Sequence, residues 1–199
     1  MKCRSFFPGA LLIVLAGCSA IGVPATSDPR EKLQQAIGLL RIDRPLPADR
    51  LIREAIDIYQ QRGDQDGLAE AYRQYALFLL SPAVTHSDYA FVQYGFTDKT
   101  ISFKTRYAKS VEYFEKAEAL YQSIGGTERA SDLSNIYLNK SDAQYLNGQT
   151  SEACASLERS RAFNHEFMAT HPGADVQVPK EFGSFDNGID KFKKQIGCI

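Results

Sequence analysis

The sequence contains few of the residues and motifs on which enzymatic chemistry depends. It has only three histidines in 199 residues, and His165 and His171 are six positions apart, so they point to different faces of a helix. We interpret these two and His86 as isolated surface residues, not as metal ligands. There is no nucleophile elbow, no phosphate-binding glycine loop and no supported pair of acidic groups. These absences predict a protein that is not an enzyme and has no catalytic residue, metal or cofactor.

The chain also lacks an excess of charge of either sign and a second long apolar run. Lys and Arg number 23 against 24 Asp and Glu, which gives a formal net charge of −1 at pH 7. Nucleic-acid binding depends on a basic surface, so nucleic acid is not an expected partner. Beyond residue 16 no apolar stretch is long enough to span a bilayer, and we expect no transmembrane helix in the body of the protein.

The N-terminal segment has a positive start, an apolar run and a short motif that ends in cysteine. Lys2 and Arg4 precede the apolar residues 10–15, and Leu15-Ala16-Gly17-Cys18 follows. This segment resembles a bacterial lipoprotein signal peptide. The resemblance implies cleavage before Cys18 and attachment of two or three acyl chains to it, which anchor a protein far more firmly than one chain. The alternative is an ordinary secretory signal with a coincidental cysteine.

The same resemblance implies a location in the cell envelope. In Gram-negative lipoproteins an Asp after the modified cysteine retains the product in the inner membrane, and this chain has Ser19 there. We therefore expect loss of residues 1–17, a flexible tether at residues 18–28 and a domain at residues 29–199 that faces the periplasm from the outer membrane. The lipid on Cys18 is then the only expected contact with the membrane.

Two cysteines remain in the body after the signal is removed and Cys18 is lipidated. They are Cys154 and Cys198, and in an oxidising compartment we predict a disulfide between them. The bond would close a loop of about 45 residues and contribute roughly 4 kcal/mol by the loop-entropy relation. It would hold the C-terminus on the last helical hairpin. The alternative is two separate thiols, one of them buried.

Apolar residues recur at helical spacing along most of the body. Asp28 followed by Pro29 predicts a helix start, and Gly63 and Gly148 predict helix ends. The expected helices cover residues 29–41, about 48–62, 65–80, about 100–124, 127–146, about 150–170 and 184–196. The apolar stripe of the helix at 127–146, which Thr127 caps, comprises Leu133, Ile136, Tyr137, Leu138 and Tyr145. The sequence therefore predicts an all-α protein.

Residues 58–64 match residues 120–126, and each window leads into a further helix. The first window and its flanks resemble the junction between successive tetratricopeptide repeats, through Ala55, Ile56, Tyr59, Gly63, Asp64, Gly67, Ala69, Tyr72 and Ala76. Residues 110–117 resemble the B-helix core of that family. The chain has no Trp, and the Leu-Gly pair of the family's A helix is missing.

The resemblance implies a short solenoid of three antiparallel hairpins at residues 29–63, 64–125 and 126–171, with residues 184–199 as a capping helix. Each hairpin would bury its apolar face only against its neighbours. The alternative is an irregular helical bundle with chance similarity to the repeat.

An insertion at residues 82–103 accounts for the extra length of the second hairpin. It contains Tyr89, Phe91, Tyr94 and Phe96 among polar residues. Their spacing of two favours a short extended piece that packs on the body or presents an edge to a partner. The alternative is that the rings only cover the side of the stack.

The inner face of a tetratricopeptide stack is lined by A helices, here residues 29–41, 65–80 and 127–146. Their polar positions include Arg73, Gln74, Asn135, Asn139 and Asp142, which we predict to face a bound protein or peptide. We expect a lipid-anchored periplasmic scaffold or adaptor that binds a protein partner, for instance during assembly of an envelope machine. The alternatives are an envelope enzyme or enzyme accessory that acts on peptidoglycan or glycan, and a secreted immunity or adhesion factor.

Overall fold

The computed structural model describes residues 22–174 and 176–198, so Cys18 and the expected signal peptide lie outside the described residues. Every regular element in these ranges is helical, which confirms the expected all-α class. In chain order the elements are α1 (Pro29–Leu40), α2 (Pro45–Arg62), α3 (Gln65–Leu80), α4 (Pro82–His86), α5 (Asp88–Tyr94), the 3₁₀ turn η2 (Phe103–Thr105), α6 (Arg106–Ile124), α7 (Arg129–Leu146), α8 (Thr150–Thr170) and α9 (Phe185–Ile196).

Aspartate side chains cap the N-termini of α1 and α3, and the first of these caps, Asp28, was expected. Asp28 accepts a hydrogen bond from the Arg30 amide at 2.9 Å, and Asp64 accepts one from the Gly67 amide at 2.9 Å. Each bond supplies an acceptor to an amide N–H of the first helical turn, which has no partner within the helix. Gly63 follows α2 in the left-handed conformation, which glycine adopts without the steric penalty of a Cβ.

Three helix starts differ from expectation. α2 begins at Pro45 instead of near Ala48, because proline is tolerated in the first turn, where its missing amide has no partner to lose. α6 begins at Arg106, after η2, instead of near residue 100. Thr127 does not cap α7, which begins at Arg129.

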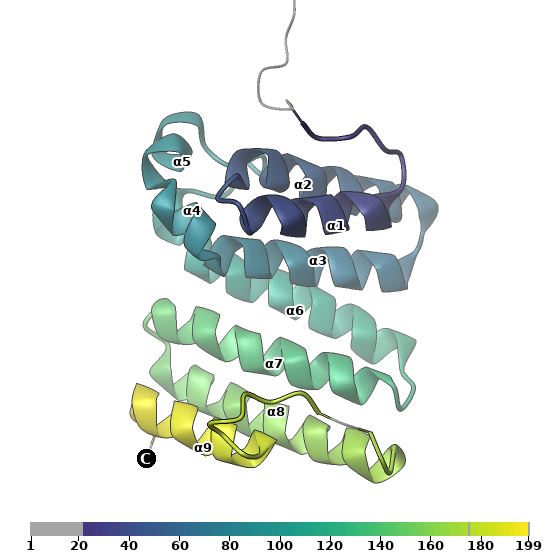
Figure 1. Cartoon of the computed structure of the whole chain (residues 1–199), viewed down its shortest axis with the longest axis vertical. Helices are drawn as coiled ribbons and strands as arrows, with labels where there is room; N and C mark the ends of the chain where they lie inside the picture. The colour runs from purple at the N-terminus through teal and green to yellow at the C-terminus, as the bar shows by residue number, and fades with distance from the viewer. Residues whose placement is uncertain (1–21, 175, 199) are drawn as a thin grey trace, which may run out of the picture.

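Helices that are adjacent in the chain pack antiparallel. The most extensive helix contacts join α7 to α8, α3 to α6 and α1 to α2. These pairs follow one another along the long axis, with α4 and α5 at one side of the α1 and α2 end (Figure 1). α1 also contacts α3, and α3 contacts α7, so these three helices share one face of the molecule.

The junction of α2 and α3 depends on a glycine. A Cβ at Gly67 would lie 2.1 Å from Cε1 of Tyr59, far inside any permitted contact. The absence of a side chain at Gly67 therefore lets the Tyr59 ring lie against the first turn of α3, where it is buried.

The first part of the insertion forms α4 and α5, and none of its residues is in a strand, so the expected extended piece is wrong. Tyr89 and Phe91 lie in α5, and two residues at this spacing point to different sides of a helix. Phe91 and Phe96 are buried with ring centroids 4.3 Å apart, and both meet Phe78 of α3 edge-on. Tyr89 and Tyr94 are exposed. Half of these aromatic residues thus hold the insertion on the body, and half face outward.

A buried carboxylate fixes the end of the insertion. Asp49 of α2 accepts hydrogen bonds from the Thr97 amide at 2.6 Å and from the Tyr75 hydroxyl at 2.8 Å. Burial raises the pKa of Asp49 above its ordinary value, against the lowering effect of these two donors. The side chain joins α2, α3 and the insertion at one point.

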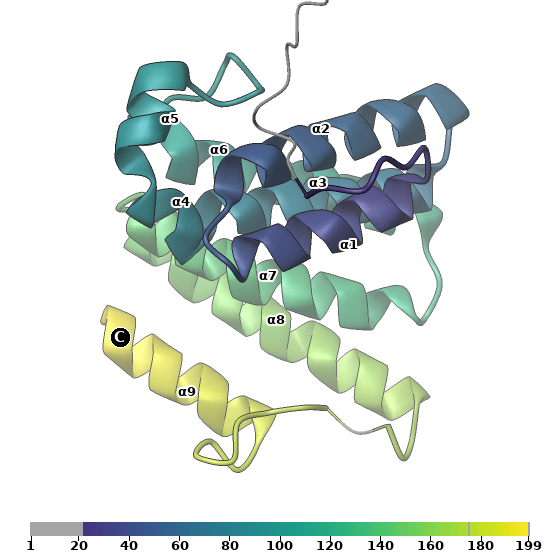
Figure 2. The same ribbon diagram turned by 45° about the horizontal axis from the view of Figure 1, so that its top comes forward.

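The predicted disulfide is present. Cys154 of α8 is bonded to Cys198, with Cα atoms 5.7 Å apart. α9 contacts α8 and lies along it at the end of the molecule opposite α5 (Figure 2). Arg161 of α8 forms ion pairs with Asp186 and Asp190, which add to the hold on α9.

Because α9 is held mainly through α8, loss of the disulfide is expected to loosen α9 alone. In a Cys154→Ser/Cys198→Ser variant, amide hydrogen exchange in residues 185–196 should accelerate by at least about tenfold. Exchange in α2 and α3 should stay unchanged and is the internal control. Equal acceleration in α2, α3 and α9 would contradict this expectation.

Candidate functional site

A recess crosses α1, α3 and α7 on their shared face. One hollow of about 290 Å³ has Ile37, Leu40, Gln74, Leu77 and Ser81 in its wall. A second, of about 370 Å³, is lined by Leu77, Ser81, Asn139, Asp142, Tyr145 and Leu146, among others. The hollows share Leu77 and Ser81, so together they form one surface, which we call the α3–α7 groove.

Large apolar side chains line this groove without being covered. Tyr145 is 44% exposed and Leu146 is 49% exposed, although both lie at the end of a well-packed helix. The sequence assigned Tyr145 to the buried stripe of its helix, and that assignment is wrong, because the end of α7 extends beyond the core toward the groove. Leu77 and Leu80 of α3 are only half-buried on the groove side.

Asp142 is the single charged side chain in the wall of the second hollow. It makes no ion pair or hydrogen bond with any of the described residues. Although the residue is exposed, the protein atoms around the carboxylate remove part of its water and raise its pKa. The first hollow also contains Arg41 and Asp43, at its α1 end. The second hollow, with its apolar side chains and one incompletely solvated carboxylate, has the chemistry to bind a cationic group flanked by apolar side chains.

Arg73 and Gln74 are both bound to one carboxylate. Glu70 accepts hydrogen bonds from Nε and Nη2 of Arg73, each at 2.8 Å, and from Nε2 of Gln74 at 2.8 Å. The guanidinium charge of Arg73 is therefore neutralised within α3. Gln74 lies in the first hollow of the groove, and Arg73 lies outside both hollows.

The asparagines predicted for the inner face lie in different places. Asn139 lines the α3–α7 groove. Asn135 instead borders a separate hollow of about 270 Å³ between α7, α9 and the segment before α9, where Phe182, Phe185 and Ile189 supply apolar walls. Residues 176–179 of this chain also line the hollow. Asn135 therefore faces the C-terminal segment of its own chain and not the α3–α7 groove.

A more polar recess lies at the other end of α3. It is about 360 Å³ in volume and is lined by Glu70, Tyr121 and Arg129, among others. Arg129 pairs with Asp66 at 2.9 Å and with Asp132 at 2.9 Å, and burial raises the pKa of Tyr121. Arg129 is thus paired with two carboxylates, whereas Asp142 has no such partner.

The three histidines occupy separate surface sites, as expected. His86 lies 3.4 Å from Asp43, and His165 lies 3.0 Å from Asp186. His171 stacks on Phe167. Within residues 22–174 and 176–198, no group of three or more His, Cys, Asp or Glu side chains is arranged to hold a metal ion.

No protein-family model matches this chain, and no curated protein is significantly similar to it. In the part of the chain that the structure describes, no helix has both the length and the apolar character needed to cross a membrane.

The apolar residues of the groove were not predicted from the sequence. Residues 76–80, Ala-Leu-Phe-Leu-Leu, are apolar all around α3, and such a helix has a second apolar face to cover. Phe78 and Leu79 are buried in the core, and Leu77 and Leu80 line the groove. This apolar run was the feature of the sequence that could have indicated the groove. The helical periodicity alone does not tell which of its residues enter the core and which line the groove.

Proposed function

We propose that this protein is a lipid-anchored adaptor of the cell envelope that holds a protein partner in the α3–α7 groove. The lipoprotein-like signal ending at Cys18 supports the anchor, and the disulfide between Cys154 and Cys198 is typical of oxidising compartments outside the cytoplasm. The three antiparallel pairs support a tetratricopeptide-like stack in which α1, α3 and α7 act as A helices.

The observation that carries the proposal is the uncovered apolar lining of the groove beside an unpaired carboxylate. Tyr145 and Leu146 are two of six large hydrophobic side chains that are exposed among the described residues, and Asp142 lies in the same hollow. Contiguous exposed apolar surface with a polar rim is typical of protein-binding sites. We infer a partner segment that places a Lys or Arg near Asp142 and apolar side chains over Leu77 and Tyr145.

Crosslinking from defined positions tests this assignment. A photo-crosslinking amino acid at Tyr145 or Asn139, introduced into the full chain in cells, is expected to capture the same envelope protein. The same amino acid at Glu115, an exposed residue of α6, is the control and should not capture it. Capture from Glu115 at the same yield, or no shared product from Tyr145 and Asn139, would overturn the proposal.

Substitutions in the groove should weaken capture without unfolding the protein. A Tyr145→Ala/Leu146→Ala variant is expected to lower recovery of the crosslinked partner from Asn139 about tenfold, because exposed apolar anchors contribute strongly to binding. Asp142→Asn should lower it less, since only the charge is lost. Both changes are at exposed positions, so unfolding midpoints should be nearly unchanged. Glu115→Ala is the matched control, and unaltered recovery in the double variant would argue against the groove.

A further inference from the structure

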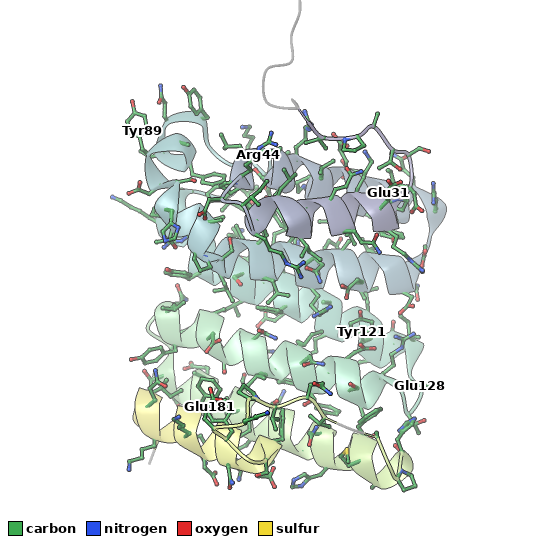
Figure 3. All side chains as sticks on the ribbon, viewed as in Figure 1. Glu31, Arg44, Tyr89, Tyr121, Glu128 and Glu181 are labelled. Carbon is green, nitrogen blue, oxygen red and sulfur yellow. A yellow bond between two sulfur atoms is a disulfide. The ribbon has the colours of Figure 1, made fainter. Side chains whose placement is uncertain are left out.

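A second uncovered apolar surface lies at the opposite end of the stack from α9. Four of the six exposed large hydrophobic side chains of the described residues are here: Ile42 at 63%, Tyr89 at 75%, Val92 at 71% and Tyr94 at 64% exposed. Three of them belong to α5: Tyr89 and Val92 are one turn apart, and Tyr94 is the last residue of the helix. We call these three exposed residues the α5 patch. Figure 3 shows Tyr89 pointing outward at this end.

The α5 patch is held in place by the core beneath it. Phe91 and Phe96 are buried against Phe78, and the Thr97 amide is bonded to the buried Asp49. The neighbouring α4 reaches the turn between α1 and α2, where His86 lies 3.4 Å from Asp43. The outward side chains of α5 are thus presented by a fixed element.

The first residue that the structure describes, Gly22, lies at this same end of the molecule. A Cβ at Gly22 would lie 3.8 Å from Nη1 of Arg44, the residue that precedes α2, and Figure 3 shows Arg44 and Tyr89 at the same end of the molecule. Cys18 is four residues before Gly22, and four residues span at most about 14 Å even when fully extended. A lipid on Cys18 therefore keeps the Arg44 end of the body close to the bilayer.

The chemistry of the patch suits the headgroup region of a bilayer. Tyrosine has an apolar ring and a polar hydroxyl, and it is enriched at membrane interfaces for this reason. Acidic Asp88 lies in α5 itself, and basic Lys99 lies at its end, with Nζ 3.8 Å from where a Cβ at Gly95 would be, so charges of both signs lie beside the patch. Attraction would come from the rings and Val92, not from net charge.

We propose that the α5 patch rests on the phospholipid surface, so that the membrane contacts the folded body as well as the lipid on Cys18. The proposal rests on the anchor in the proposed function. It orients the stack with α1, α2 and α5 toward the bilayer and α8 and α9 away from it, and it leaves the α3–α7 groove open at the side.

The test uses the full-length lipoprotein in phosphatidylcholine liposomes. An environment-sensitive fluorophore is attached through Val92→Cys, and lipids carrying a nitroxide on the headgroup serve as quencher. Glu166→Cys on α8, also exposed, is the matched control. We expect at least about threefold more quenching at position 92 than at position 166, with no loss in 0.5 M salt because the attraction is not ionic.

A second variant separates the patch from simple proximity. Tyr89→Ser/Tyr94→Ser in the Val92→Cys background should reduce the quenching at position 92 by about half or more while the protein stays attached. Equal quenching at positions 92 and 166, unchanged quenching in the double variant, or loss of the signal in salt would each overturn the proposal. Palmitate incorporation at Cys18 is measured in parallel, so that failure of the anchor is distinguished from failure of the docking.

Discussion

Replacing Phe78 with alanine is expected to lower the free energy of unfolding by about 4 kcal/mol. The Phe78 ring is fully buried and lies 5.5 Å from Tyr75, 6.0 Å from Phe91 and 6.2 Å from Phe96 between centroids. Its removal leaves a cavity where α3 meets the insertion, and the rigid neighbours cannot close it. Urea unfolding followed by circular dichroism measures the loss.

Phe78→Leu is the control for cavity size, since it keeps most of the buried volume and should cost only about 1.5 kcal/mol. In the alanine variant, proteolysis should also be faster within residues 82–103 than elsewhere, because Phe91 and Phe96, the two rings that hold the insertion, lose their partner on α3. A loss below about 1 kcal/mol for Phe78→Ala would contradict the assignment of this ring to the core.

Asp49→Ala is expected to cost about 3 kcal/mol, because it leaves the Tyr75 hydroxyl and the Thr97 amide without their acceptor. Both donors lie within 2.8 Å of the carboxylate, and the side chain is 2% exposed. The measurement is again urea unfolding, with Asp57→Ala, at an exposed position of the same helix, as the control. Equal stability of the two variants would show that the Asp49 contacts contribute nothing.

The titration of Asp49 gives a separate expectation. Burial raises its folded-state pKa above the unfolded value, so its contribution to stability is present below the unfolded pKa and is lost as pH rises through the folded pKa. Asp98 acts oppositely: burial raises its pKa, but hydrogen bonds from Tyr113 and Thr100 hold it below the ordinary value. Because the pKa of Asp49 is raised, Asp49→Asn should lower the free energy of unfolding, relative to wild type, more near pH 4 than near pH 7. A larger loss near pH 7 would contradict the direction of this pKa shift.

Local features of the fold were predictable because they depend on neighbouring residues. Asp28 and Asp64 cap helices through bonds to amides two and three residues away, and such contacts can be inferred from the sequence. The disulfide was predictable by elimination among four cysteines. The conformation of α5 was not, because an aromatic spacing of two fits a strand equally well when the burial of Phe91 against Phe78 is unknown.

The candidate site was less predictable because it depends on contacts between distant segments. Gln74, Asn139 and Asp142 were chosen as polar positions on neighbouring helices, and the structure places all three in the α3–α7 groove. Arg73 and Asn135 came from the same reasoning, but a neighbouring carboxylate binds the first and the C-terminal segment lies against the second. Only the three-dimensional packing distinguishes these outcomes.

The long connection between α3 and α6 also affects the order in which the helices pack against one another during folding. α7 and α8 are joined by residues 147–149, whereas α3 and α6 are separated by residues 81–105. While the insertion is still unfolded, closing that longer connection costs about 2 kcal/mol more chain entropy. We therefore expect the hairpins with short connections, α7–α8 and α1–α2, to form before the central pair, which is completed when Phe91 and Phe96 pack on Phe78.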